Sequence, residues 1–142
     1  MPKLLVPIDG SESAIHALDH AIALAKERGG YELDLLNVHP EPIVYGEIQV
    51  YATVERLLEE QRKLSQTLLA PAVERVKAAG VPFRVEIESG DPAMTIARRA
   101  DALGCEGIVM GTRGMGAIAN LLLGSVAAKV VHLATVPVTL VK

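Results

Sequence analysis

The sequence predicts an α/β fold in which five short strands alternate with four helices in one domain, residues 1–142. Short runs rich in Leu, Val and Ile occur five times, and stretches with helical spacing of apolar residues separate them. Capping and turn residues mark most of the boundaries. Because a helix separates each strand from the next, we expect an open parallel sheet whose strands are joined by right-handed crossovers.

The apolar runs place the strands at residues 3–8, 32–39, 82–89, 107–110 and 136–141. The stretches between them place the helices at residues 11–28, 53–79, 91–103 and 125–133. Ser11 and Asp91 have the side chains that cap a helix start, and Pro92 suits a first turn. Gly29 and Gly104 stand where the first and third helices should end.

The second helix is the longest, and its pattern is the least regular. Its expected core stripe consists of Leu57, Leu64, Leu68 and Val76. Pro71 lies inside it and is expected to kink or split it. Residues 40–52 before it have no regular pattern. In the strand at 82–89 apolar residues alternate with charged ones, which favours an edge strand with one face in water.

Composition narrows the class of protein. Half of the residues are apolar but only 3% are aromatic, so the core should consist of Ala, Val, Leu and Ile. The formal net charge is −3 and no run of Lys or Arg forms a basic patch, which disfavours a nucleic-acid partner. The first apolar run ends at Asp9, too short for a signal peptide or a membrane span. Cys105 is the single cysteine, and we expect a cytoplasmic protein without a membrane partner.

The segment between the fourth strand and the last helix is rich in glycine. Its glycines are Gly111, Gly114, Gly116 and Gly124. Glycine permits positive φ and a close approach of the backbone to a ligand, and inward-facing N–H groups form an anion site. The helix after Gly124 adds free N–H groups and a positive dipole end. The hydroxyls of Thr112 and Ser125 and the cation of Arg113 are further candidates, so the segment predicts phosphate binding.

Two known phosphate motifs do not match this segment. GxxxxGK[ST] is absent, and the spacing is not GxGxxG; the segment also follows the fourth strand instead of the first. Glycines after a strand often serve only a turn. Here the preceding strand, the glycines and the following helix agree, which favours a phosphate site over a simple turn.

The turn after the first strand should lie opposite the glycine-rich segment. Ligands in open α/β sheets bind beyond the carboxyl ends of the strands, where the strand order reverses. If the first and fourth strands are neighbours, Pro7, Asp9 and Gly10 face the glycines across that gap. Asp9 then accepts a ribose hydroxyl or an adenine amine. A plain role at the helix start beside Ser11 is as natural for Asp9 taken alone.

These residues resemble the ATP-binding branch of the universal stress protein family. That branch is marked by G-x-x-G, nine residues and then G-[ST], and Gly111, Gly114, Gly124 and Ser125 fit this spacing. The resemblance covers the whole chain. It includes Val6-Pro7-Ile8-Asp9-Gly10-Ser11, Leu36-Asn37-Val38-His39, Gly90-Asp91-Pro92 and Val136-Pro137-Val138.

The resemblance implies a Rossmann-like sheet of order 3-2-1-4-5 with helices on both faces, as in the adenine nucleotide alpha hydrolase-like folds. It implies adenine near Asp9 and the backbone of Val38, and ribose and phosphates on Gly111–Gly116 and residues 124–126. Met110 borders the site, where contact with the base and a place in the core are equally natural. The candidate binding residues are Pro7, Asp9, Gly10, Val38, Met110, Gly111, Thr112, Arg113, Gly114, Met115, Gly116, Gly124, Ser125 and Val126.

The expected ligand is ATP, with AMP or ADP as alternatives and with Mg²⁺ or Mn²⁺ carried by the phosphates. Family members are usually homodimers joined through their last strands, and residues 136–141 offer a strand edge for such pairing. No catalytic residue and no separate metal site stand out in the sequence. His16 and His20 are four residues apart, which is more typical of an exposed helix face than of a metal site.

Three functions remain open from the sequence. The first is a nucleotide-binding protein with a regulatory or stress-response role. The second is a slow ATPase or a self-phosphorylating enzyme, for which Arg113 would neutralise charge at the γ-phosphate. The third is a protein-interaction module that binds no nucleotide, against which the complete glycine pattern argues.

Overall fold

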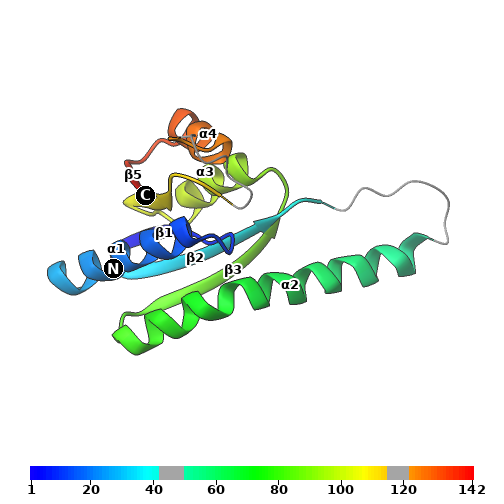
Figure 1. The fold of residues 1–142 in the computed structure, drawn as a ribbon, viewed down its shortest axis with the longest axis horizontal. Coiled ribbons are helices and arrows are strands. Elements are labelled where there is room, and N and C mark those ends of the chain that lie inside the picture. Colours follow the sequence, from blue (N-terminus) through cyan, green and yellow to red (C-terminus); the bar gives the residue numbers. More distant parts are fainter. Residues whose placement is uncertain (42–49, 115–121) are drawn as a thin grey trace.

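The computed structural model describes residues 1–41, 50–114 and 122–142, without the side chains of 50–53. In this part of the chain strands and helices alternate as expected (Figure 1). The strands are β1 (Lys3–Pro7), β2 (Glu32–His39), β3 (Phe83–Ser89), β4 (Gly107–Gly111) and β5 (Val138–Val141). The helices are α1 (Glu12–Arg28), α2 (Val50–Ala79), α3 (Pro92–Ala102) and α4 (Ser125–Leu133).

The five strands form one parallel sheet of order β3-β2-β1-β4-β5, which confirms the predicted fold class and strand order. Leu5 of β1 pairs with Asp34 of β2 on one side and Ile108 of β4 on the other. The chain leaves β1 toward β2 and leaves β4 toward β5, so the strand order reverses between β1 and β4. This switch point fixes where a ligand crevice can open.

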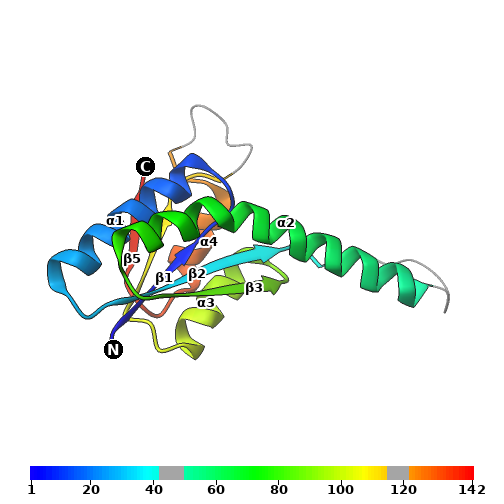
Figure 2. The same cartoon turned by 90° about the horizontal axis from the view of Figure 1, so that it is seen from below.

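Two apolar clusters flank the sheet, one on each face. Helices α1 and α2 cover one face, where Leu18 and Val76 pack on strand residues such as Leu33 and Leu35. Helices α3 and α4 cover the other face, where Ile96 and Val130 pack on a second set of strand residues (Figure 2). Alternate strand residues therefore serve opposite clusters, as the period of two in a strand requires.

Side-chain caps begin α1 and α3, as the sequence predicts. Ser11 Oγ accepts a hydrogen bond from the backbone N–H of Ala14 at 3.1 Å. A carboxylate oxygen of Asp91 accepts from the N–H of Met94 at 2.9 Å. Such caps satisfy N–H groups that have no partner inside the helix.

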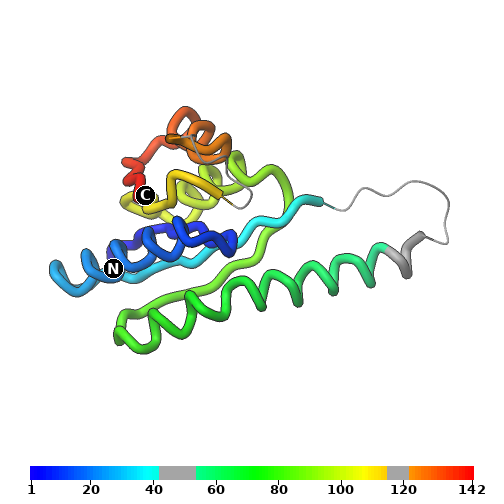
Figure 3. Tube along the Cα trace, in the orientation of Figure 1, coloured from blue at the N-terminus to red at the C-terminus, as the bar shows by residue number. Residues whose placement is uncertain are grey.

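Helix α2 differs from its prediction in two ways. It continues through Pro71, so the expected split is wrong; buried Leu69, Ala72 and Val76 hold the helix on the sheet on both sides of the proline. Leu57 and Leu64 of the expected core stripe are 37% and 60% exposed. Leu57 belongs to the N-terminal part of α2, which extends past the carboxyl ends of β2 and β3 (Figure 3). Leu64 is exposed for another reason: the next residue, Ser65, is 1% exposed, so Leu64 lies on a different side of the helix from the buried face.

The remaining differences lie at element ends. Helix α2 begins at Val50, inside the segment predicted to be irregular, and β5 begins at Val138 instead of 136. β3 lies at an edge of the sheet, as its alternating pattern predicts. Among the helices of the described residues, none is both long and apolar enough to cross a membrane.

Candidate functional site

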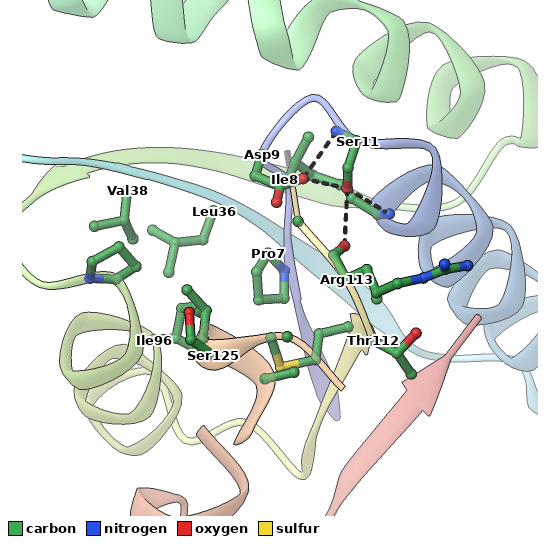
Figure 4. Close-up of a pocket in the computed structure, with 18 residues that line it drawn as sticks. Pro7, Ile8, Asp9, Ser11, Leu36, Val38, Ile96, Thr112, Arg113 and Ser125 are labelled. Atoms are coloured by element: carbon green, nitrogen blue, oxygen red, sulfur yellow. Dashed lines mark hydrogen bonds between the residues drawn. The ribbon is translucent and has the colours of Figure 1, made fainter. Parts of the chain in front are cut away.

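A pocket of about 430 Å³ opens at the carboxyl ends of β1 and β4, the switch point of the sheet (Figure 4). It brings together eleven of the predicted site residues: Pro7, Asp9, Val38, Met110, Gly111, Thr112, Arg113, Gly114, Gly124, Ser125 and Val126. They come from four separate segments of the chain. The fold therefore brings together residues, such as Pro7 and Ser125, that are more than a hundred positions apart in the sequence. The volume is within the range of small-molecule sites.

Three predicted residues stand apart from this group. Gly10 does not line the pocket; its φ of +87° serves the turn after β1, where Leu68 packs against it. A positive φ strains any residue with a Cβ, so this glycine has a structural reason of its own. Met115 and Gly116 lie outside the described residues.

The sequence reasoning missed the other lining residues, which are Ile8, Ser11, Ala14, Leu36, Pro92, Ile96 and Ala127. Two of them had a usable signal. Leu36 lies two positions before Val38 on β2 and therefore points to the same face. Ile96 lies one helical turn after Pro92, at the end of α3 that meets the pocket. Figure 4 shows Leu36, Val38 and Ile96 gathered on one side of Pro7.

Asp9 combines the two roles that the sequence left open. Its Oδ1 accepts from the N–H and the hydroxyl of Ser11, at 2.9 and 2.5 Å, so the carboxylate does serve the start of α1. Its Oδ2 points to Gly114, where a Cβ would approach within 2.9 Å. The second oxygen therefore lies at the edge of the pocket and next to the glycine-rich segment.

The three described glycines of the glycine-rich segment are needed for close packing and not for positive φ. None of Gly111, Gly114 and Gly124 has a positive φ. A Cβ on Gly111 would overlap Ser13 of α1, and a Cβ on Gly124 would lie 3.2 Å from the Thr112 carbonyl oxygen. The Gly124 N–H donates to that oxygen at 2.6 Å, which joins the two ends of the segment. Gly111 and Gly124, which are expected to allow a close approach of the backbone to a ligand, therefore allow the backbone to pack closely against other parts of the protein.

The N-terminus of α4 opens onto the pocket without a side-chain cap. Gly124 occupies the cap position with φ −71° and ψ 163°, and it has no side chain that could bond to the first turn. The N–H groups of Ser125 and Val126 have no partner within the helix. Together with the positive end of the helix dipole they form a site for an anion.

The side chains of Arg113 and Thr112 both lie on the side of the pocket away from Val38 and Ser125 (Figure 4). The Arg113 guanidinium extends over α1 and away from Val38 and Ser125 (Figure 4), which contrasts with its predicted place beside the phosphates. Thr112 is buried, and its hydroxyl oxygen has no hydrogen-bond partner among the described residues. The hydroxyl oxygen is also shielded from solvent, so it does not face a ligand in the pocket, in contrast to the predicted role of this hydroxyl.

His16 and Asp19 have partners on the protein surface. His16 Nδ1 lies 2.8 Å from the Lys142 backbone oxygen, and Asp19 forms an ion pair with Arg75 at 3.0 Å. Within residues 1–41, 54–114 and 122–142, no three His, Cys, Asp or Glu side chains gather where one ion could bind them.

A buried polar pair lies apart from the pocket, under α3. Asp34 of β2 is 1% exposed, and the Cys105 thiol donates to its carboxylate at 3.7 Å. Burial raises the pKa of Asp34. Burial first, and then the charge of Asp34, raise the pKa of Cys105 to about 12. The thiol is therefore protonated near neutral pH and is a poor nucleophile.

Comparison with known proteins agrees with this geometry. The model of the universal stress protein family matches residues 1–142. The universal stress protein YxiE of Bacillus subtilis is 36% identical, over 99% of this chain and 98% of its own length. The solved structure of the hypothetical protein MJ0577 has a TM-score of 0.84 and 30% identity, covering 99% of this chain and 94% of that one.

A second solved structure is that of a universal stress protein in complex with cAMP. It has a TM-score of 0.75 and 27% identity, covering 99% of this chain and 97% of that one. The fold, the family model that matches the whole chain and the curated relatives all agree. The chain therefore belongs to the universal stress protein family.

Proposed function

We propose that the pocket binds an adenine nucleotide, with ATP as the resident ligand. The observation that carries this proposal is the meeting of an apolar wall with an uncapped helix N-terminus in one cavity. The apolar wall suits a flat base, and the free N–H groups suit phosphate oxygens. A cavity of about 430 Å³ is large enough for a ligand of this size.

The base would lie against Leu36, Val38 and Ile96. These aliphatic side chains come from β2 and α3 and form one side of the pocket. Asp9 Oδ2, whose partner oxygen is already held by Ser11, would accept a ribose hydroxyl or the adenine amine. A relative of 27% identity is described in complex with cAMP, which supports adenine as the base.

The phosphates would lie on backbone N–H groups of Gly114, Ser125 and Val126. The hydroxyl of Ser125 would add a hydrogen bond, as a donor to a phosphate oxygen. Met115 and Gly116 continue the same segment and belong to this proposed set. A divalent cation, Mg²⁺ or Mn²⁺, would arrive with the phosphates and balance their charge.

The role proposed for the nucleotide is regulatory, in a cytoplasmic stress-response protein that forms a homodimer through β5. β5 is an edge strand of the sheet, and Leu140 on it is 37% exposed. An uncovered edge is a template for the same strand of a second copy. Val131 and Leu133 of the preceding helix, 49% and 42% exposed, add apolar surface nearby.

The test is titration calorimetry of nucleotide-free protein with ATP, AMP, cAMP and GTP, in parallel with two variants of Ser125. Ser125→Pro removes the first N–H of α4, while its ring suits the first helical position and the ψ of Gly124. Ser125→Ala removes only the hydroxyl. We expect Ser125→Pro to weaken ATP binding at least about tenfold, as one charge-assisted hydrogen bond implies, and more than Ser125→Ala does.

Two results would overturn the proposal. One is wild-type protein that gives no binding heat with any adenine nucleotide, which would leave an interaction module on the same fold. The other is an equal ATP affinity of Ser125→Pro and wild type, which would mean that the phosphates do not bind at the N-terminus of α4. Mass spectrometry of the nucleotide that co-purifies with the protein identifies the resident ligand independently.

A further inference from the structure

Strand β3 leaves one edge of the sheet open. Among the strands of the described residues it pairs only with β2. The Pro82 oxygen and the Gly90 N–H, just before and just after β3, both form hydrogen bonds with β2. The backbone groups of even-numbered residues therefore point to β2. Those of odd-numbered residues, such as Val85 and Ile87, point outward, because the direction alternates along a strand.

A pocket of about 310 Å³ lies at this open edge, between α2 and β3. The two elements lie next to each other in two perpendicular views (Figures 1 and 2). The residues that line the pocket are Arg62, Gln66, Leu69, Val73, Val85 and Ile87. Val85 is 41% exposed, although its side chain is on the α2 side of the strand. The outward backbone groups and the apolar side chains of the pocket therefore belong to the same residues of β3.

We propose that the β3 edge binds an extended, acidic segment of a partner protein, which adds a further strand to the sheet. The added strand pairs with the outward N–H and C=O groups of Val85 and Ile87, and these main-chain hydrogen bonds give affinity. Every second side chain of the added strand points to the α2 side. There Leu69 and Val73 offer an apolar surface, which selects aliphatic side chains.

Arg62 selects a carboxylate in the same segment. Within residues 1–41, 54–114 and 122–142 its guanidinium forms no ion pair, either with Glu59 one turn away or with another carboxylate. Helix α2 and β3 run in opposite directions (Figure 2), so Arg62 lies toward the carboxyl end of β3 and Val73 toward its start. The partner segment therefore has aliphatic side chains at alternate positions, followed toward Arg62 by Asp or Glu at the next alternate position.

The charges on the other face of β3 do not prevent this pairing. Charged side chains on an edge strand often keep other chains away. Here Glu86 and Glu88 pair with Arg99 at 2.7 and 3.6 Å. Arg84 pairs with Glu32 at 3.9 Å. These charges are balanced within the protein. The β3 edge is also opposite to the β5 edge and separate from the nucleotide pocket, so the contact does not depend on nucleotide binding.

Fluorescence anisotropy with labelled peptides and the full-length protein tests the proposal. The first probe is a short peptide of alternating Val and Thr in which Glu replaces the last Val. The second probe has the reverse sequence, so that the pair covers both directions of an added strand. The matched protein variants are Arg62→Glu and Lys63→Glu, two exposed positions with the same change in charge. Lys63 lies about 100° around the helix from Arg62 and does not line the pocket.

We expect at least one of the two peptides to bind wild type. Arg62→Glu should weaken this binding at least about fivefold, whereas Lys63→Glu should stay within about twofold of wild type. A peptide with Lys in place of Glu should prefer Arg62→Glu to wild type. Methylation of alternate peptide nitrogens removes the N–H groups that pair with β3 and should abolish binding.

Amide hydrogen exchange followed by NMR locates the contact on the protein. The outward N–H groups of Val85 and Ile87 should exchange more slowly when the peptide is bound. Those of Arg84 and Glu86, which point to β2, should change little. Three results would each overturn the proposal: no binding of either peptide to wild type, equal losses of affinity in Arg62→Glu and Lys63→Glu, or unchanged exchange at Val85 and Ile87 with the peptide bound.

Discussion

The Ser13 hydroxyl donates a hydrogen bond to the backbone oxygen of Val141 across 3.2 Å, and so links the first turn of α1 to the end of β5. The same Oγ accepts from the N–H of Arg113 at 3.3 Å. The N–H of Thr112 donates to the same Val141 oxygen at 2.9 Å. The start of α1, the last strand and the glycine-rich segment are therefore fixed to one another beside the pocket.

Gly111 is the position where this packing leaves no room for a side chain. A Cβ there would overlap the Ser13 hydroxyl and lie 2.7 Å from its carbonyl carbon. We expect Gly111→Ala to lower the free energy of unfolding by about 1–3 kcal/mol, the usual cost of overpacking. Urea denaturation followed by circular dichroism measures the change.

The control for this prediction is a double-mutant cycle with Ser13→Gly. Removing the Ser13 side chain should reduce the cost of Gly111→Ala, although the contact with the Ser13 backbone remains. Additive effects of the two substitutions would show that the overlap with the Ser13 side chain is not the source of the cost.

Gly114 should respond in the opposite way. Among the described residues, a Cβ there would meet only the Asp9 Oδ2 atom, at 2.9 Å, and the end of a carboxylate side chain can move. We therefore expect Gly114→Ala to change stability by less than about 0.5 kcal/mol. The displaced carboxylate should weaken ATP binding several-fold in calorimetry, a change of about 1 kcal/mol. Weakened folding with unchanged affinity would contradict this assignment.

Much of the fold and site could be predicted because their signals are local. The caps at Ser11 and Asp91 and the glycine spacing between Gly111 and Ser125 are written in short segments. The role of each segment, however, depends on the residues that pack against it in the fold. Gly111 is predicted to approach a phosphate, yet the atoms nearest to a Cβ at this position belong to Ser13, 98 residues earlier in the chain. Only the fold brings these two together.

Helix α2 illustrates the same limit. Periodicity identifies which residues share a helix face, but it contains no information on whether a sheet lies beneath that face. Val76 is buried in the cluster between α2 and the strands, whereas Leu57, in the part of α2 that extends past the sheet, is 37% exposed. The lining residues Leu36 and Ile96 were missed for a related reason, since an apolar residue in a pocket has the same pattern as one in the core.

Ser11 is expected to affect both folding and binding. Its Oγ caps α1 and contacts Asp9 Oδ1, and it lies 3.4 Å from the Arg113 carbonyl oxygen. Ser11→Ala should lower the free energy of unfolding by about 1 kcal/mol through the lost cap. It should also weaken ATP binding, because the Asp9 carboxylate loses its hydroxyl partner.

Asp91→Ala is the matched control for Ser11→Ala. Asp91 caps α3 in the same way and does not line the pocket. We expect a similar loss of stability in urea denaturation but an ATP affinity close to that of wild type. If both variants lose affinity equally, the effect of Ser11 is a general result of helix fraying.

Arg113 is expected to contribute little to any turnover of ATP. Its guanidinium extends over α1 and away from the pocket (Figure 4), and Arg113→Ala should therefore leave phosphate release at saturating ATP slow and within about twofold of wild type. A fast wild-type rate that falls by about 10³-fold in Arg113→Ala would instead indicate a cation acting at the γ-phosphate. A malachite green assay with and without Mg²⁺ distinguishes these outcomes.

Asp34 should make stability depend on pH in a predictable direction. Burial raises its pKa in the folded protein above the ordinary value of 3.8, so the folded state binds the proton first as the pH falls. The penalty of the buried charge is complete at pH 7 and decreases as the pH falls through the raised pKa toward 3.8. Asp34→Asn keeps the shape and removes the charge. We expect the variant to gain more stability over wild type at pH 7 than at pH 4, measured by urea denaturation at both values. A stability difference between the two proteins that does not change with pH would mean that Asp34 is not destabilised by its burial.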